Sequence, residues 1–236
     1  MTTTADIADA TLDSLADDLR GELLRPGDAG YGEARAVWNG RFDARPDAVA
    51  RCTGAADVVA AVDLAREHDV PLSVKGGGHD YAGNAVRDEG LLVDLSPMDA
   101  VRVDPDAGTV RAGPGATWAD VDHETQSFGL ATTGATVSTV GVAGYTLGGG
   151  TGHLARTLGL AVDNLTGADV VTADGELVHA GRSENPDLFW ALRGGGGNFG
   201  VVTSFEFDLH PVGPELLAGQ VVHPFEDARD VLDRYR

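Results

Sequence analysis

Two glycine-rich runs constrain this chain more than any other feature of its sequence. The first spans residues 75–83 (KGGGHDYAG) and the second spans residues 138–152 (STVGVAGYTLGGGTG). Glycine reaches positive φ angles freely and, without a Cβ, lets backbone N–H groups approach a ligand closely. Consecutive glycines can therefore form a concave anion-binding site for a diphosphate. Because the short apolar stretch 72–74 precedes the first run, that run is predicted to begin where a strand ends.

His79 follows three consecutive glycines of the first run. A ring nitrogen at this position can reach the group that a bound diphosphate carries. The placement suggests a tether rather than a proton shuttle. The alternative is a loop histidine that is hydrogen-bonded to nearby backbone.

These motifs resemble those of the berberine bridge enzyme-like oxidoreductases, which share the FAD-binding fold of the vanillyl-alcohol oxidase (PCMH) type. A third run, residues 187–203 (DLFWALRGGGGNFGVVT), resembles a further signature of that family, so the resemblance covers roughly residues 41–211. It implies that His79 is bonded to the 8α-methyl group of FAD. Doubly tethered members carry a cysteine in the second loop, where this chain has Val137. The resemblance therefore implies attachment through His79 only.

The resemblance implies an FAD site built from all three runs, with no catalytic residue assigned in this chain. Besides the covalent ligand His79, the expected cofactor-binding residues are Lys75, Gly76, Gly77, Gly78, Asp80, Ser138, Thr139, Gly141, Val142, Gly144, Tyr145, Gly149, Gly150, Gly152, His153, Gly200 and Val202. No metal is expected, because the seven histidines lack H-x-x-x-H spacing and there is one cysteine. Tyr81 and Tyr145 are expected to pack over the flavin or its rim.

A dinucleotide site of the Rossmann type is the formal alternative. Residues 150–155 (GTGHLA) fit the pattern G-x-G-x-x-A, and Asp169 follows at about the distance expected for an acidic ribose contact. The segment before this motif is interrupted by glycine and does not resemble a clean buried strand. The alternative also leaves His79 unexplained.

Charge limits the partners and the setting of the protein. Asp and Glu number 37 against 17 Lys and Arg, which gives a formal net charge of −20 at pH 7. Nucleic acid and anionic membrane are excluded as partners because both require a basic surface. Self-repulsion of this size destabilises a compact state unless salt screens it, and the Debye length falls to about 3 Å at molar salt. Without a leader sequence or an apolar run of membrane-spanning length, a high-salt cytoplasm is expected.

Hydrophobic periodicity predicts an α+β fold. The expected helices cover residues 5–24, 53–68 and 117–128, and the expected strands cover 72–74, 91–95, 108–112, 170–173, 177–179 and 201–209. The resemblance adds a strand at 216–222 and a helix at 225–236, as the start of a substrate domain. Asp174-Gly175 predicts a hairpin between two of these strands. Residues 48–52 alternate like a strand, and Cys52 within them is expected to be half-buried. Trp118 and Trp190 are expected to be buried core residues of helices.

The resemblance also implies a domain order and a reaction. Residues 1–40 form a helix and lead-in, 41–212 form the PCMH-type FAD-binding domain with α/β subdomains at 41–115 and 116–211, and 213–236 begin an antiparallel substrate domain. The implied reaction oxidises a C–H bond next to an alcohol or amine of a small molecule by hydride transfer to flavin. A second polypeptide or a homo-oligomer is expected to complete the substrate side. The alternatives are a flavin-binding module without turnover and a remnant that no longer binds cofactor.

Overall fold

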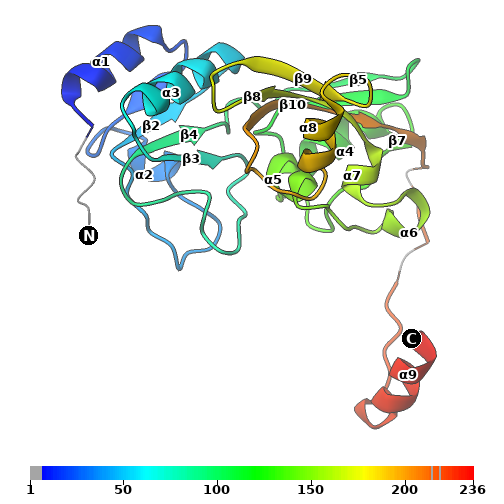
Figure 1. The fold of residues 1–236 in the computed structure, drawn as a ribbon. Helices are drawn as coiled ribbons and strands as arrows, with labels where there is room; N and C mark the ends of the chain where they lie inside the picture. The colour runs from blue at the N-terminus through cyan, green and yellow to red at the C-terminus, as the bar shows by residue number, and fades with distance from the viewer. Residues whose placement is uncertain (1–6, 214, 218) are drawn as a thin grey trace.

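The computed structural model describes residues 7–213, 215–217 and 219–236, and two lobes, each built on one sheet, dominate it (Figure 1). The first lobe holds a four-stranded sheet in the order β1-β2-β4-β3. Strands β2, β3 and β4 are parallel, and β1 pairs antiparallel with β2. The strands are β1 (Glu22–Leu24), β2 (Ala48–Arg51), β3 (Leu72–Lys75) and β4 (Leu91–Asp94). Every residue of β4 is buried, as expected for a central parallel strand that is covered on both faces.

Helices cover both faces of this first sheet (Figure 1). On one face, α1 (Asp9–Asp18) and α3 (Ala55–Glu67) pack against Ala48, Ala50 and Val93. On the other face, the short helix α2 (Tyr31–Ala34) packs against Val49 and Leu92. Neighbouring residues of β2 and β4 therefore enter opposite cores, which is the alternation that a strand imposes.

The second lobe holds a five-stranded antiparallel sheet in the order β5-β6-β10-β8-β9. Its strands are β5 (Val101–Asp104), β6 (Thr109–Ala112), β8 (Leu165–Val171), β9 (Leu177–Gly181) and β10 (Val201–Asp208). Its helices are α4 (Trp118–Gln126), α5 (Val142–Leu147), α6 (Ala155–Leu158), α7 (Ala161–Asn164) and α8 (Pro186–Leu192). A further antiparallel pair joins β7 (Leu130–Ala131) to β11 (His210–Pro211). The core of the second lobe is aromatic, and the side chains of Trp118, Phe205 and Phe207 in it are fully buried.

The two lobes are joined through the ends of the long strands. Helix α3 of the first lobe contacts β8 and β10 of the second. Val171 and Val201, at the paired ends of β8 and β10, belong to the apolar core around α3. The lobes therefore share part of one core, which fixes the space that remains between them.

Most predicted elements are confirmed, including the α+β class, the helices at α3 and α4 and the strands at β3, β4, β6 and β10. The predicted hairpin is also confirmed, because β8 pairs antiparallel with β9 across Asp174-Gly175. Helix α4 begins at a capping box in which the hydroxyl and the backbone N–H of Thr117 both donate to Asp120 Oδ2, at 2.7 and 2.8 Å.

Two predicted segments are wrong in part. The helix predicted over residues 5–24, of which 5 and 6 lie outside the described residues, ends at Asp18. It stops because Asp57 of α3 accepts the N–H groups of Arg20 and Gly21, after which the chain pairs with β2. The strand predicted over 216–222 is absent from its described residues 216, 217 and 219–222, which lack a neighbouring strand to pair with. A helix does follow, formed by η1 (Phe225–Asp227) and α9 (Ala228–Tyr235), and it lies apart from both lobes (Figure 1).

Two further expectations need correction. Trp190 on α8 is 74% exposed, because the apolar side of that short helix is formed by Phe189 and Leu192. Cys52 is fully buried rather than half-buried, beneath α3.

Candidate cofactor site

A cavity of about 1280 Å³ lies between the two lobes. Its volume exceeds the roughly 300–1,000 Å³ of common small-molecule pockets. Its wall includes the first glycine run, with His79 and Tyr81, and Val62, Ala65 and Arg66 of α3. A cavity of this volume suits a large ligand.

The two predicted glycine runs meet at the cavity. A Cβ added to Gly77 would lie 2.5 Å from the Cα of Gly141, and one added to Gly141 would lie 2.7 Å from the Cα of Gly77. A Cβ on Gly76 would lie 2.7 Å from the carbonyl oxygen of Pro114. Atoms this close overlap in van der Waals terms, so glycine is required for the loops to touch. The sequence pattern thus reflects a backbone-to-backbone contact that leaves a cradle facing the cavity.

His79 lies on the cavity wall directly beyond this contact. Its Nε2 is 3.5 Å from the Thr139 hydroxyl, which belongs to the second glycine run. Thr139 itself does not line the cavity. The imidazole of the first run therefore contacts the second run.

The predicted site residues divide into two sets. Those that line the cavity are Gly76, Gly77, Gly78, His79, Asp80, Gly141, Gly144, Tyr145, Gly200 and Val202. Those that do not are Lys75, Ser138, Thr139, Val142, Gly149, Gly150, Gly152 and His153. Gly150 has a packing role, because a Cβ there would lie 2.5 Å from the ring of Tyr145. The second run is therefore partly a ligand-facing loop and partly the support for Tyr145.

Lys75 is turned away from the cavity. Its ammonium group donates to the carbonyl oxygen of Ala34 and lies 3.4 Å from Asp94 Oδ1. Asp94 is fully buried and also accepts from the backbone N–H of Ser96. Arg51 Nε is 3.4 Å from the other carboxylate oxygen. The single lysine of the chain thus anchors the start of the glycine loop to β4 and to the α2 segment.

Three residues of the cavity wall carry a hydroxyl group that lacks a protein partner. The hydroxyl oxygens of Ser73, Tyr145 and Thr172 are buried and form no hydrogen bond with any described residue. Burial raises the pKa of Tyr145 to about 12, so this hydroxyl remains a neutral donor. Buried polar groups are nearly always paired in folded proteins. These three oxygens are inaccessible to solvent, and the Tyr145 hydroxyl lies beside Gly152, outside the cavity wall, so they are not placed to contact a ligand in the cavity.

Sequence reasoning missed parts of the wall on both lobes. The additional lining residues include Val62, Ala65 and Arg66 of α3, Val171 to Ala173 at the end of β8, and Asn198. Asn198 lies within the third run, which could have indicated it, but Val62 and Val171 read as ordinary core positions. Helix α3 and the end of β8 reach the cavity because the two lobes dock there.

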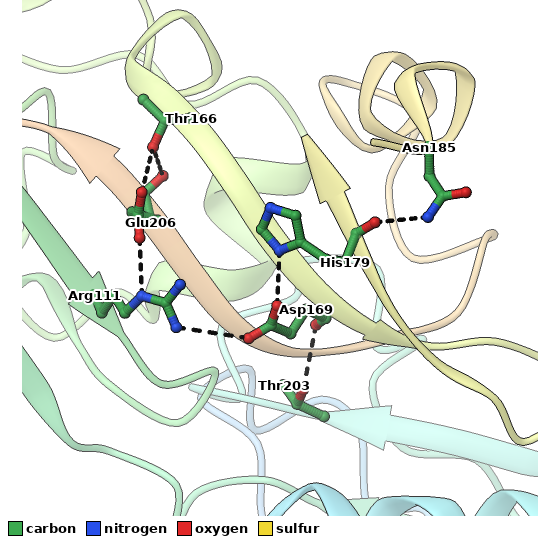
Figure 2. A network of polar contacts seen from close by, with 7 residues as sticks. All are labelled: Arg111, Thr166, Asp169, His179, Asn185, Thr203 and Glu206. Carbon is green, nitrogen blue, oxygen red and sulfur yellow. Dashed lines mark hydrogen bonds and ion pairs between the residues drawn. The ribbon is translucent and has the colours of Figure 1, made fainter. Parts of the chain in front are cut away.

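The Rossmann alternative is wrong. The run at residues 150–155 follows helix α5 rather than a strand, so the strand-turn-helix that cradles a pyrophosphate is missing. Asp169 lies in a polar network on the second sheet (Figure 2). Its carboxylate is 2.9 Å from His179 Nδ1 and 3.8 Å from Arg111, which itself donates to Glu206 at 2.8 Å. Asp169 is outside the cavity wall and is not placed to contact a ribose there.

The described residues lack two other kinds of site. No group of three or more His, Cys, Asp or Glu side chains among them is arranged to hold a metal ion. Within those same residues, no helix combines the length and the apolar character needed to cross a bilayer.

A large cavity between two lobes, with two touching glycine loops in its wall, defines a protein suited to hold a large cofactor that carries an anionic group. Residues 46–181 match the family described as FAD binding domain, and the chain belongs to this family. The fold is accordingly the PCMH-type arrangement that the three motifs predict, and the chain is related to FAD-linked oxidoreductases.

Relatives of known structure support the assignment. The chain is 39% identical to (R)-6-hydroxynicotine oxidase of Paenarthrobacter nicotinovorans over 201 residues. The crystal structure of 6-hydroxy-D-nicotine oxidase from Arthrobacter nicotinovorans superimposes with a TM-score of 0.83, covering 85% of this chain and 44% of that one. BBE-like 1 of Physcomitrella patens is 31% identical, with a TM-score of 0.77 and coverage of 84% and 44%.

A carbohydrate oxidase matches as well. The glucooligosaccharide oxidase of Acremonium strictum, whose structure is described as revealing a novel flavinylation, is 37% identical with a TM-score of 0.80. The match covers 84% of this chain and 42% of that one. The chain therefore spans less than half the length of each of these relatives.

Proposed function

We propose that this chain is the FAD-binding half of an oxidoreductase and that it holds the flavin through a covalent bond to His79. The observation that carries the proposal is the position of the imidazole on the cavity wall, beside the contact between Gly77 and Gly141. A nucleophilic side chain at the edge of a nucleotide-sized cavity is suited to a permanent attachment. The described residues of the cavity wall include no cysteine that could form a second tether, because Cys52 is buried elsewhere.

The chain's own groups would divide the work of binding. Backbone N–H groups of residues 76–80 and of Gly141, Ala143 and Gly144 would receive the diphosphate at the cavity wall. Gly149, Gly150, Gly152 and His153 would act indirectly by holding the second loop, and Gly200 and Val202 would close the wall beside Val171.

The proposed tether requires a balanced exchange of atoms and electrons. A nitrogen of His79 would form an N–C bond to the 8α carbon, while one C–H bond of that methyl group and one imidazole N–H bond break. Both hydrogens leave as protons, the electron pair of the C–H bond passes into the flavin ring, and dioxygen removes it on reoxidation. The flavinylation described for the oxidase of Acremonium strictum supports such chemistry in a related protein.

The proposed reaction oxidises a small molecule at a C–H bond next to an alcohol or an amine. FAD, when bound, supplies an acceptor for a hydride, and oxygen or another acceptor then removes the electrons. The relatives support both substrate classes, because one is named for a hydroxynicotine and another for a glucooligosaccharide. This chain would hold and orient the flavin, and groups beyond the described cavity would choose the substrate.

Acid precipitation of the protein purified in high salt tests the tether. Wild-type protein should retain yellow, flavin-fluorescent material in the pellet, and His79→Ala should release it into the supernatant. His68→Ala is a matched control, because His68 ends helix α3 outside the cavity wall. Cys52→Ala should also retain flavin. Equal release from wild type and His79→Ala would contradict covalent attachment through His79.

We further propose that the protein works in a high-salt cytoplasm. The support is the net charge of −20, which repels the compact state unless ions screen it. The midpoint of thermal unfolding should rise steadily between dilute buffer and molar potassium chloride. Equal midpoints in the two buffers would remove the argument for a saline setting.

A second polypeptide surface is proposed to cover helix α9 and complete the substrate side. Leu232 and Tyr235 on that helix are 65% and 91% exposed, and Phe225 just before it is 92% exposed. Apolar side chains gathered on one exposed helix are typical of a contact surface. Light scattering should therefore show self-association or binding of a second chain, and Leu232→Lys should abolish it. A monomer indifferent to this substitution would contradict the proposal.

A further inference from the structure

The segment at residues 34–42 lies against the His79 loop along most of its length. At its start, the carbonyl oxygen of Ala34 accepts from the ammonium group of the buried Lys75. Four residues later, the backbone N–H of Trp38 donates to the carbonyl oxygen of Gly78 at 2.9 Å. The loop is therefore held at Lys75, just before its three glycines, and at Gly78, the residue that precedes His79.

The same segment continues beyond the histidine. The Asn39 side-chain amide donates to the carbonyl oxygen of Tyr81 at 3.1 Å. The ring of Phe42 packs beneath Gly83, where an added Cβ would lie 2.5 Å from the ring. Gly83 has a φ of 78°, a left-handed conformation that glycine adopts without strain. The loop thus curves around Phe42.

Between these attachment points, the indole of Trp38 covers the imidazole of His79. The ring centroids are 4.7 Å apart and the planes are inclined by 19°, which is a stacked arrangement. Trp38 is 58% exposed, so it forms an outer cover rather than a core residue. The indole restrains the plane of the imidazole, and the Thr139 hydroxyl, 3.5 Å from Nε2, restrains its edge.

We propose that Trp38 is a positioning residue that sets the orientation of His79 for flavin attachment. This inference rests on the proposed covalent tether. A histidine on a glycine-rich loop otherwise samples several χ1 rotamers, and attachment requires one that directs a ring nitrogen into the cavity. A stacked neighbour that selects this rotamer before the flavin arrives raises the fraction of productive encounters. FAD binding itself depends on the cavity wall, to which Trp38 does not belong.

The test compares the attachment rates of four proteins. Wild type, Trp38→Ala, Trp38→Phe and Phe128→Ala are produced under riboflavin limitation and incubated with FAD in high salt, and acid-stable flavin is followed over time. Phe128 is a matched control because it is another aromatic residue, 51% exposed, outside the cavity wall. Non-covalent FAD affinity is measured in the His79→Ala background, with and without Trp38→Ala.

Trp38→Ala should attach flavin about fivefold more slowly, the size expected for the loss of one aromatic contact. Trp38→Phe should restore most of the rate, Phe128→Ala should match wild type, and FAD affinity in the His79→Ala background should be unchanged. In flavin-free protein, the His79 ring-proton resonance, assigned through His79→Ala, should move downfield in Trp38→Ala as the indole ring current is lost.

The possible failures are distinguishable. A wild type that attaches no flavin overturns the tether and, with it, the positioning role. A wild type that attaches flavin no faster than Trp38→Ala overturns the positioning role alone. If Trp38→Ala lowers non-covalent FAD affinity in the His79→Ala background as much as it slows attachment, Trp38 supports the loop in general. That result also overturns the positioning role.

Discussion

Replacing Gly77 with alanine is the sharpest perturbation of the cavity. The added methyl would lie 2.5 Å from the Cα of Gly141, and the next atom it meets is also backbone, Gly141 N at 2.8 Å. Carbon atoms pack at about 3.5–4.0 Å, so the loops must separate by about 1 Å. Overpacking of this kind costs about 1–3 kcal/mol. For a chain of this size, the cost corresponds to about 2–12 °C in the unfolding midpoint.

Gly144→Ala is the matched control for Gly77→Ala. In the part of the chain that the structure describes, nothing lies within 4 Å of a Cβ at Gly144, yet this glycine lines the cavity. Its flavin-free unfolding midpoint, followed by circular dichroism in molar salt, should match or exceed that of wild type, since alanine favours helices. Gly77→Ala should lower the same midpoint and weaken FAD binding. An unchanged midpoint for Gly77→Ala, or an equal loss in Gly144→Ala, would refute this reasoning.

Two further predictions concern buried titrating groups of the first lobe. Burial alone would raise the pKa of Asp57, but hydrogen bonds from Thr53, Arg20 and Gly21 lower it overall. The stabilisation that the ionised carboxylate gives the folded state is therefore present above pH 4 and is lost as pH falls through the native pKa. Asp57→Asn should therefore cost about 1–3 kcal/mol at neutral pH in urea unfolding, and a difference from wild type that does not shrink in acid would contradict this. Burial raises the pKa of Cys52 from 9.0 to about 12, so the thiol should resist alkylation in native protein at pH 8. Between pH 9 and 12 the free energy of unfolding of wild type should fall about 1.4 kcal/mol per pH unit more steeply than that of Cys52→Ala, and parallel profiles would count against it.

Much of the fold was predictable because local signals agree with the tertiary structure. Helix α4 begins where Thr117 and Asp120 form a capping box, and the hairpin turns at Asp174-Gly175. The glycine runs were recognisable because backbone contact at Gly77 and Gly141 tolerates no side chain. These features depend on a few adjacent residues, or on a residue type that admits no substitute.

The rest depends on contacts between distant segments. Helix α1 ends early because Asp57, far along the chain, accepts the N–H groups of Arg20 and Gly21. Trp38 reads as an isolated aromatic residue in a loop, and only the folded chain places it on His79. Lys75 is the first residue of the first glycine run, yet the buried carboxylate of Asp94 draws its side chain away from the cavity. Such pairings leave no periodic signal in either partner.

Peptide mapping of the flavin tests the central claim most directly. Protein purified in high salt is precipitated with acid, digested with a protease, and searched by mass spectrometry for peptides that carry flavin. The account predicts a single flavin-bearing peptide, the one that contains Gly76 to Asp80, with fragmentation that places the modification on His79. Flavin on any other peptide, or flavin fully released by acid from a protein that binds it, would contradict attachment through His79.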